Sequence, residues 1–145
     1  MKKLKIGQIG IGHNHGSAKM EAFRKFPDRF EIVGFSEEDP VWLRERSELP
    51  AYQGLTRMGT EELLDKCDAI LVETMVPNLT KTARLCVEAG KHIHLDKPGS
   101  GTLELSKSLH WLFDNGYNGF VGLEYRPTAD TQSSLEMTFR TLGPR

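Results

Sequence analysis

The sequence predicts an α/β fold: a three-layer, Rossmann-like doubly wound parallel sheet of about six strands in a single domain. Two observations predict it. Short apolar segments alternate about six times with segments of helical periodicity, a pattern that implies right-handed βαβ crossovers and helices on both faces of a parallel sheet. The first apolar segment also leads directly into a glycine-rich turn, Gly10 to Gly16, as in dinucleotide-binding folds.

The predicted strands are short apolar runs bounded by glycine, proline or polar residues. Leu4–Ile11 is mostly apolar and ends in glycines, and Asp68–Thr74 contains the run Ala-Ile-Leu-Val. Both suit strands that are buried in a parallel sheet. The other predicted strands are Phe30–Phe35, Tyr52–Leu55, His92–Leu95 and Phe120–Tyr125.

The predicted helices lie between these strands, and several have characteristic ends. Pro40 suits the first turn of a helix that runs to Arg46. Thr60 suits the cap of a helix with two glutamates in its first turn. Gly90 suits the C-terminal cap of a helix over Leu79–Ala89. The other predicted helices are Ser17–Phe26, Thr102–Phe113 and Asp130–Leu142.

Composition and charge exclude several classes of partner. The formal net charge of −1 and the absence of basic runs argue against binding to nucleic acid or to an anionic membrane. No apolar run approaches the length of a membrane span, and the N-terminus does not resemble a signal peptide. We therefore expect a cytoplasmic protein, in which Cys67 and Cys86 are reduced and structural.

The glycine-rich turn is the first candidate site. A strand that leads through Gly-x-Gly into a helix lets backbone N–H groups approach a pyrophosphate, and the helix N-terminus adds partial positive charge. The usual third glycine of the motif falls at His15, and Gly16 follows it. The residues predicted to bind the cofactor here are Gly10, Gly12, His13, Asn14, His15 and Gly16.

An acidic residue follows the second predicted strand at the distance such a site requires. Glu37, next to Ser36, lies about 20 residues after the turn, where a carboxylate accepts hydrogen bonds from ribose hydroxyls. A carboxylate there repels a 2′-phosphate, so the sequence favours NAD over NADP. The alternative is that Glu37 to Asp39 form a solvated turn before a helix.

Residues Lys5 to Pro98 resemble the N-terminal domain of the Gfo/Idh/MocA oxidoreductase family. The resemblance depends on Ile9–Gly12, on Glu31–Glu37 and on Glu88–Pro98. The last segment ends in Asp96-Lys97-Pro98, which is similar to the family's Glu-Lys-Pro motif with aspartate in place of glutamate. The resemblance implies that Lys97 contacts the nicotinamide ribose and the substrate and is catalytic. It also implies that Thr74, Asp96 and Pro98 lie at the nicotinamide side.

The C-terminal segment resembles a different family. Leu112–Pro127 is similar to the last βα unit of hydroxypyruvate isomerase-type barrels, with Glu124 at the position of a metal-binding carboxylate. The other strands that such a site needs are missing, so no isomerase site is expected. We therefore expect residues 1–98 to form the dinucleotide-binding part. Residues 99–145 would complete the same domain, in a chimera that arose by gene fusion or by recombination.

Two pairs of histidines are candidate metal ligands. His13 and His15, and likewise His92 and His94, are two residues apart, which on a strand points both side chains the same way. Zinc prefers four ligands, and neither cysteine is near either pair in the sequence. We expect no metal site and assign the first pair to the cofactor loop.

These observations predict an NAD(H)-binding domain related to sugar or polyol dehydrogenases. It would lack the substrate domain, be inactive alone, and form a homodimer through its exposed apolar surface. Two alternatives remain open. The chain could be a dehydrogenase completed by a partner chain, or a truncated or chimeric Rossmann scaffold that binds no ligand.

Overall fold

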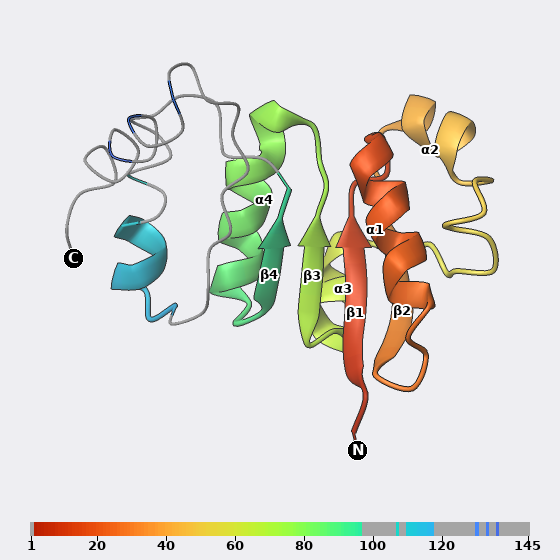
Figure 1. The fold of residues 1–145 in the computed structure, drawn as a ribbon, viewed down its shortest axis with the longest axis horizontal. Helices are drawn as coiled ribbons and strands as arrows, with labels where there is room; N and C mark the ends of the chain where they lie inside the picture. Colours follow the sequence, from red (N-terminus) through yellow and green to blue (C-terminus); the bar gives the residue numbers. More distant parts are fainter. Residues whose placement is uncertain are drawn as a thin grey trace.

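The computed structural model describes residues 2–96, 107, 110–117, 130, 133 and 136 of the 145-residue chain. Within these residues the fold is a parallel sheet with the strand order β2-β1-β3-β4 (Figure 1). The predicted class, an α/β fold with a parallel Rossmann-like sheet, is confirmed. The strands are β1 (Leu4–Ile9), β2 (Phe30–Ser36), β3 (Ala69–Val72) and β4 (His92–Leu95).

One predicted strand is wrong, and another lies outside the described residues. Residues 51–54 form turns rather than a strand, and Tyr52 N donates to Leu49 O at 2.8 Å. The aromatic side chain of Tyr52 is fully buried against Phe35, so its hydrophobicity reflects a turn that covers the core. The predicted strand Phe120–Tyr125 lies outside the described residues, and the described sheet has four strands.

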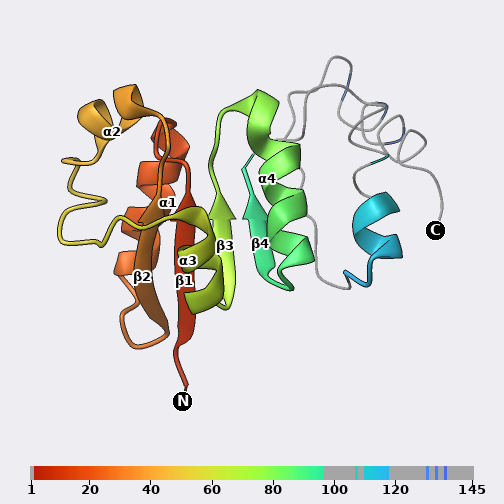
Figure 2. The same cartoon turned by 180° about the vertical axis from the view of Figure 1, so that it is seen from behind.

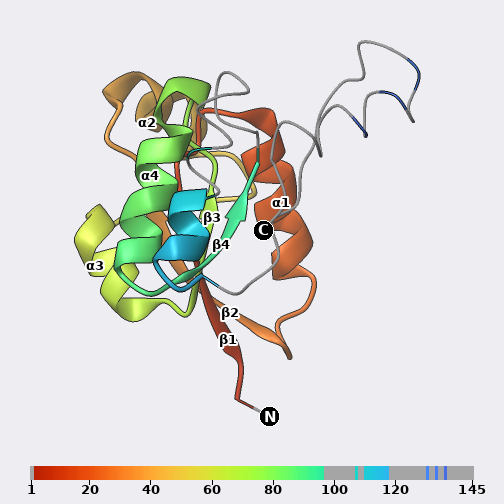
Figure 3. The same ribbon diagram turned by 90° about the vertical axis from the view of Figure 1, so that its left-hand side faces the viewer.

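The helices cover both faces of the sheet. They are α1 (Asn14–Arg24), α2 (Pro40–Arg46), α3 (Thr60–Lys66) and α4 (Val76–Glu88). Seen edge-on, α1 lies on one side of the sheet, and α3 and α4 lie on the other (Figure 3). This is the consequence of right-handed crossovers that run in opposite directions from the central pair β1 and β3.

The helix ends follow local chemistry, with three corrections. Helix α4 begins at Val76 rather than at the predicted Leu79, with a proline in its first turn. Helix α1 begins three residues before the predicted Ser17, because the Nδ1 atom of His13 accepts the His15 N–H at 3.2 Å and caps the helix. Thr60 is the first residue of α3 and does not cap it. The predicted ends at Pro40 and at Gly90, which has a φ of +69°, are confirmed.

Two hydrophobic clusters, one containing Leu63, Ile70 and Leu79 and the other Ile11, Met20 and Tyr52, form the core. A short helical segment at residues 110–114 lies beside α4 (Figure 2). Its Leu112 is buried, and the Arg84 guanidinium lies 4.8 Å from the centre of the Trp111 ring. Among the described helices, none is long and apolar enough to cross a membrane.

Candidate functional site

The glycine loop lies at the carboxyl end of β1, at the centre of the sheet. Gly10 has a φ of +91°, a conformation that side chains rarely adopt. A Cβ atom at Gly10 would lie 2.6 Å from the backbone of Glu73 and Thr74. The loop therefore passes directly over the end of β3, and only glycine fits there.

Gly16 takes over the packing role of the motif's third glycine. It is buried, and a Cβ atom there would lie 2.9 Å from Gln8 Nε2 and 3.2 Å from Glu73 Cβ. His15 stands at the expected position but is exposed. The departure seen in the sequence therefore leaves the close packing of α1 on the sheet intact, because the contact falls one residue later.

The buried side-chain amide of Gln8 is hydrogen-bonded to the glycine loop. The Nε2 atom of Gln8 donates to Gly10 O at 2.8 Å and to the Tyr52 hydroxyl at 2.8 Å. Burial raises the pKa of Tyr52 to about 12, so its hydroxyl stays protonated. Gln8 thus connects the loop to the turn that contains Tyr52.

Glu37 reaches the loop from the end of β2. Its Oε2 atom accepts the Ile11 N–H at 2.9 Å, and its Oε1 atom accepts the Asp39 N–H at 3.0 Å. The side chain is half-buried. A solvated turn before α2 is thus present, but the carboxylate itself lies against the glycine loop, and both of its oxygens retain further acceptor capacity.

Two residues of α2 that sequence reasoning missed also contact the loop. The Arg46 guanidinium donates to Gly12 O at 3.2 Å and to Asn14 Oδ1 at 2.5 Å. A Cβ atom at Gly12 would lie 2.8 Å from the Trp42 ring. The sequence predicts neither contact, because the residues on one face of a helix do not indicate which loop that face contacts.

A cavity of about 1070 Å³ opens at the carboxyl ends of the strands. The glycine loop, the end of β2 and the segment after β3 all line it. The buried Oγ1 atom of Thr74 has no hydrogen-bond partner in the part of the chain that the structure describes. The predicted site residues among its lining are Gly10, Gly12, Ser36, Glu37 and Thr74.

A largely buried charge cluster lies beside this cavity, between the middle of α1 and the ends of β3 and β4. The Lys19 ammonium contacts both the Glu73 carboxylate, at 2.9 Å, and the Asp96 carboxylate. Burial lowers the pKa of Lys19, but the hydrogen bonds to Asp96 and Glu73 outweigh burial and raise it. Burial raises the pKa of Glu73 to about 7, although Lys19 opposes this.

The structure brings most of the predicted residues together. Asp96 is buried and lies near His13 and His15, at 3.7 and 3.5 Å between imidazole Nδ1 and carboxylate oxygens. Lys97 and Pro98 lie outside the described residues. Lys19 and Glu73 were not identified as site residues from the sequence. Glu73 could have been identified, because it directly follows an apolar strand.

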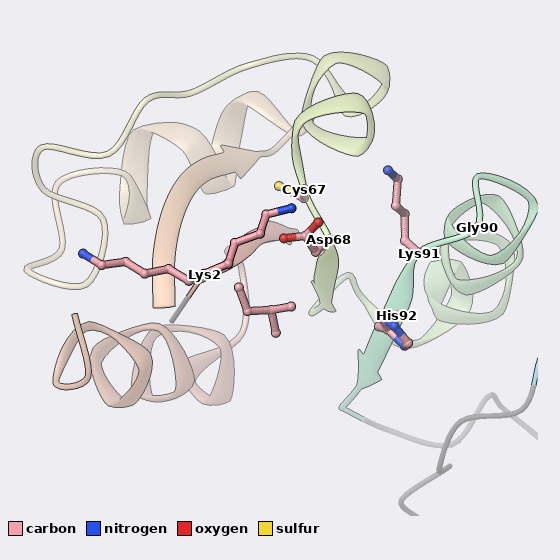
Figure 4. Close-up of a pocket in the computed structure, with 8 residues that line it drawn as sticks. Lys2, Cys67, Asp68, Gly90, Lys91 and His92 are labelled. Carbon is pink, nitrogen blue, oxygen red and sulfur yellow. The ribbon is translucent and has the colours of Figure 1, made fainter. Parts of the chain in front are cut away.

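A second hollow, of about 410 Å³, lies at the amino ends of the strands, opposite the cavity at their carboxyl ends (Figure 4). Asp68 lies on its floor and accepts the Lys5 N–H at 2.9 Å. The side chains of Lys91 and His92 also line the hollow, but they do not point towards Asp68 (Figure 4). One oxygen of its acidic group is thus hydrogen-bonded to the backbone, and the hollow does not gather a reactive set of groups.

Comparisons with known proteins match this architecture. The profile of the family described as "Oxidoreductase family, NAD-binding Rossmann fold" (Gfo/Idh/MocA) matches residues 4–115. A putative hydroxypyruvate isomerase of Mus musculus is 34% identical over 88 residues, which cover 56% of this chain and 32% of that protein.

Solved structures of dehydrogenases share the fold at low sequence identity. The WlbA dehydrogenase from Bordetella pertussis, in complex with NADH and UDP-GlcNAcA, is 22% identical with a TM-score of 0.65 over 83% of this chain and 38% of that one. The MviM dehydrogenase from Clostridium difficile is 24% identical, with a TM-score of 0.66 over 83% and 39%. UDP-N-acetylglucosamine 3-dehydrogenase GnnA from Acidithiobacillus ferrooxidans is 21% identical, with a TM-score of 0.64 over 84% and 39%.

Proposed function

Because the chain belongs to the Gfo/Idh/MocA oxidoreductase family with an NAD-binding Rossmann fold, we propose that it binds NAD(H) at the carboxyl ends of its strands. The observation that carries the proposal is that the glycine loop and Glu37 line one cavity of about 1070 Å³. This volume is slightly above the range of typical small-molecule sites, about 300–1000 Å³.

Each part of the cavity fits one part of the dinucleotide. The glycine loop lines the cavity at Gly10 and Gly12, and the first turn of α1, which follows the loop, offers backbone N–H groups and partial positive charge to the pyrophosphate. Glu37 accepts from the ribose hydroxyls, for which its oxygens have capacity left. Thr74 Oγ1, buried without a partner among the described residues, supplies a hydrogen bond on the nicotinamide side.

The charge on the ribose side favours NAD over NADP. Glu37, Glu38 and Asp39 line the same end of the cavity. A 2′-phosphate placed against Glu37 would meet like charge, whereas free hydroxyls would be bound. The predicted preference therefore depends on Glu37 rather than on the fold.

Hydride transfer is a separate matter from cofactor binding. When bound, NAD(H) accepts or donates a hydride at its nicotinamide ring. The chain spans about a third of the length of the relatives it matches. We propose that this part holds the cofactor and is inactive alone, with Asp96, Lys97 and Pro98 on the nicotinamide side. A substrate site supplied by a partner chain is the alternative.

The composite origin and the homodimer belong to the same proposal. A composite origin is supported by the isomerase relative, at 34% identity over 88 residues. The match to the oxidoreductase family over residues 4–115 extends past the proposed boundary at residue 98. Self-association is supported by exposed apolar side chains near the cavity, such as Met75 and Leu85, which are 47% and 42% exposed. Light scattering that gives one chain per particle would contradict the homodimer.

A fluorescence titration with NADH tests the cofactor proposal. We expect saturable binding, a roughly tenfold loss of NADH affinity in Glu37→Ala, and a smaller preference for NADH over NADPH in that variant. Glu21→Ala, which removes an exposed glutamate of α1, should leave both unchanged. The proposal fails if NADH gives no saturable signal up to millimolar concentration. An unchanged preference in Glu37→Ala would reject its ribose role.

A further inference from the structure

Three side chains from two distant parts of the chain converge beside the first turn of α1. The metal-ligating atoms of His13, His15 and Asp96 all lie within 4.8 Å of one another. The carboxylate is buried, at 3% side-chain exposure, whereas the two imidazoles are 39% and 47% exposed. The group therefore consists of a buried carboxylate and two partly exposed imidazoles that can shift towards it.

The two imidazole–carboxylate separations are close to those within a metal coordination sphere, whereas the donor atoms of the two histidines lie within 4.8 Å of each other. Metal–nitrogen and metal–oxygen bonds of about 2.0–2.2 Å place neighbouring donor atoms about 2.9–3.4 Å apart. The two imidazole–carboxylate separations are 3.7 Å for His13 and 3.5 Å for His15. Shifts of a few tenths of an ångström would bring these pairs into range, and the exposed rings have room to make them.

The protonation of one donor also suits coordination. His13 Nδ1 accepts the His15 N–H, so this nitrogen is unprotonated, and coordination through it would replace the hydrogen bond that caps α1. The two imidazole rings meet edge to face, with 4.7 Å between their centroids. The set is two imidazoles and one carboxylate, with the remaining coordination positions open to solvent.

We propose that His13, His15 and Asp96 bind a divalent first-row transition-metal ion, with water in its other positions. Imidazole nitrogen is a ligand for zinc, copper, nickel and iron, and the two-histidine, one-carboxylate set with open positions is a known arrangement for such ions. The sequence argument against a metal did not include Asp96, because this residue follows β4 and no local spacing connects it to the histidine pair.

Lys19 limits the affinity of this site. Its ammonium contacts Asp96 Oδ1, on the His15 side of the carboxylate, while Oδ2 faces His13. Lys19 also contacts Glu73, so it keeps a partner when a metal takes Asp96. The two cations repel one another, and removal of the ammonium should tighten metal binding.

Calorimetric titration of the chain with ZnCl₂, in the absence of NAD(H), tests the proposal independently of the cofactor. We expect one ion per chain, and at least a tenfold loss of affinity in His15→Ala and in His13→Ser. Serine retains an acceptor for the helix cap, so the second variant removes the imidazole and keeps the cap. Cobalt(II) should give visible absorption bands that both variants lose.

Two further variants complete the experiment. His92→Ala removes an exposed histidine at the start of β4, at the amino ends of the strands, and should leave zinc affinity unchanged. Lys19→Gln, if circular dichroism shows it folded, should bind zinc several-fold more tightly. Absence of zinc binding by the wild-type chain up to millimolar concentration, or equal affinity in the wild type and a His13→Ser, His15→Ala double variant, would overturn the proposal.

Discussion

The ammonium of Lys19, on the first helix, donates to the buried carboxylate of Glu73, directly after β3, at 2.9 Å. The Glu73 side chain is fully buried, and that of Lys19 is 24% exposed. The same ammonium contacts Asp96 after β4. One cation therefore holds two carboxylates from two neighbouring strands, and the stability of the site region depends on it.

Lys19→Met is expected to destabilise the protein by about 2–3 kcal/mol. Removing one partner of a buried ion pair leaves an uncompensated charge, which costs about 3–5 kcal/mol when burial is complete, and the partial exposure of Lys19 reduces this. Urea unfolding at neutral pH measures the change. Lys25→Met, at an exposed lysine just after α1, should cost less than about 0.5 kcal/mol. Equal effects of the two substitutions would contradict the prediction.

Glu73 is expected to make stability fall as the pH rises towards 8. Its pKa is raised from 4.5 to about 7, chiefly by burial. The folded state therefore keeps a proton that the unfolded state releases near pH 4.5. This contribution is present in full below pH 4.5 and is lost as the pH rises through 7. It is worth at most about 3 kcal/mol.

The test compares urea unfolding of the wild type and Glu73→Gln between pH 5 and pH 8. The groups that face Glu73 are Lys19, Asp96, His15 and His94. These groups are present in both proteins, so the difference between the two curves isolates Glu73. We expect the variant to gain relative stability as the pH rises. Parallel curves would show that Glu73 does not titrate in this range.

The layout of the sheet and its helices was predictable, because hydrophobic periodicity and end residues report local structure. Gly90 and Pro40 end or begin their helices as predicted. The failures come from tertiary packing. Tyrosine is common in strands, but Tyr52 lies in a turn, and its side chain is buried against Gln8 and Phe35. Nothing in its neighbouring sequence indicates these partners.

The site was predictable in outline only. The loop and Glu37 are recognisable because their spacing is local to one βαβ unit, and the structure places them against one cavity. Lys19, Glu73 and Asp96 come from three separate segments. Their grouping depends on the order of the strands in the sheet, and a single sequence does not predict which side chains that order brings into contact.

Gly10→Ala is expected to destabilise the protein by about 3 kcal/mol or more. The substitution combines a φ of +91° with a Cβ atom 2.6 Å from backbone that cannot move aside. Gly54→Ala is the matched control, since it has a φ of +73° but open space around it, and should cost about 1 kcal/mol. Both are measured by urea unfolding. A cost for Gly10→Ala no greater than for Gly54→Ala would show that the loop can move away from β3.

Both cysteines are expected to be unreactive in the folded protein. Burial raises the pKa of Cys67 to about 11 and that of Cys86 to about 12, and the residues are 3% and 0% exposed. The thiolate is the reactive form. Reaction with Ellman's reagent at pH 8 should be slow in native protein and release two thiols rapidly in 6 M urea. Rapid native labelling would indicate local opening of the cluster around Cys67 and Cys86.

Trp42 should report NADH binding directly. Its ring covers Gly12 and lines the proposed cofactor cavity, whereas Trp111, the second tryptophan, packs against Arg84 and is not itself among the residues that line the cavity. Bound NADH absorbs tryptophan emission, and transfer is most efficient at short distance. Titration with NADH should therefore quench tryptophan fluorescence strongly in Trp111→Phe and weakly in Trp42→Phe. Equal quenching in both variants, with unchanged NADH affinity, would place the dinucleotide away from the glycine loop.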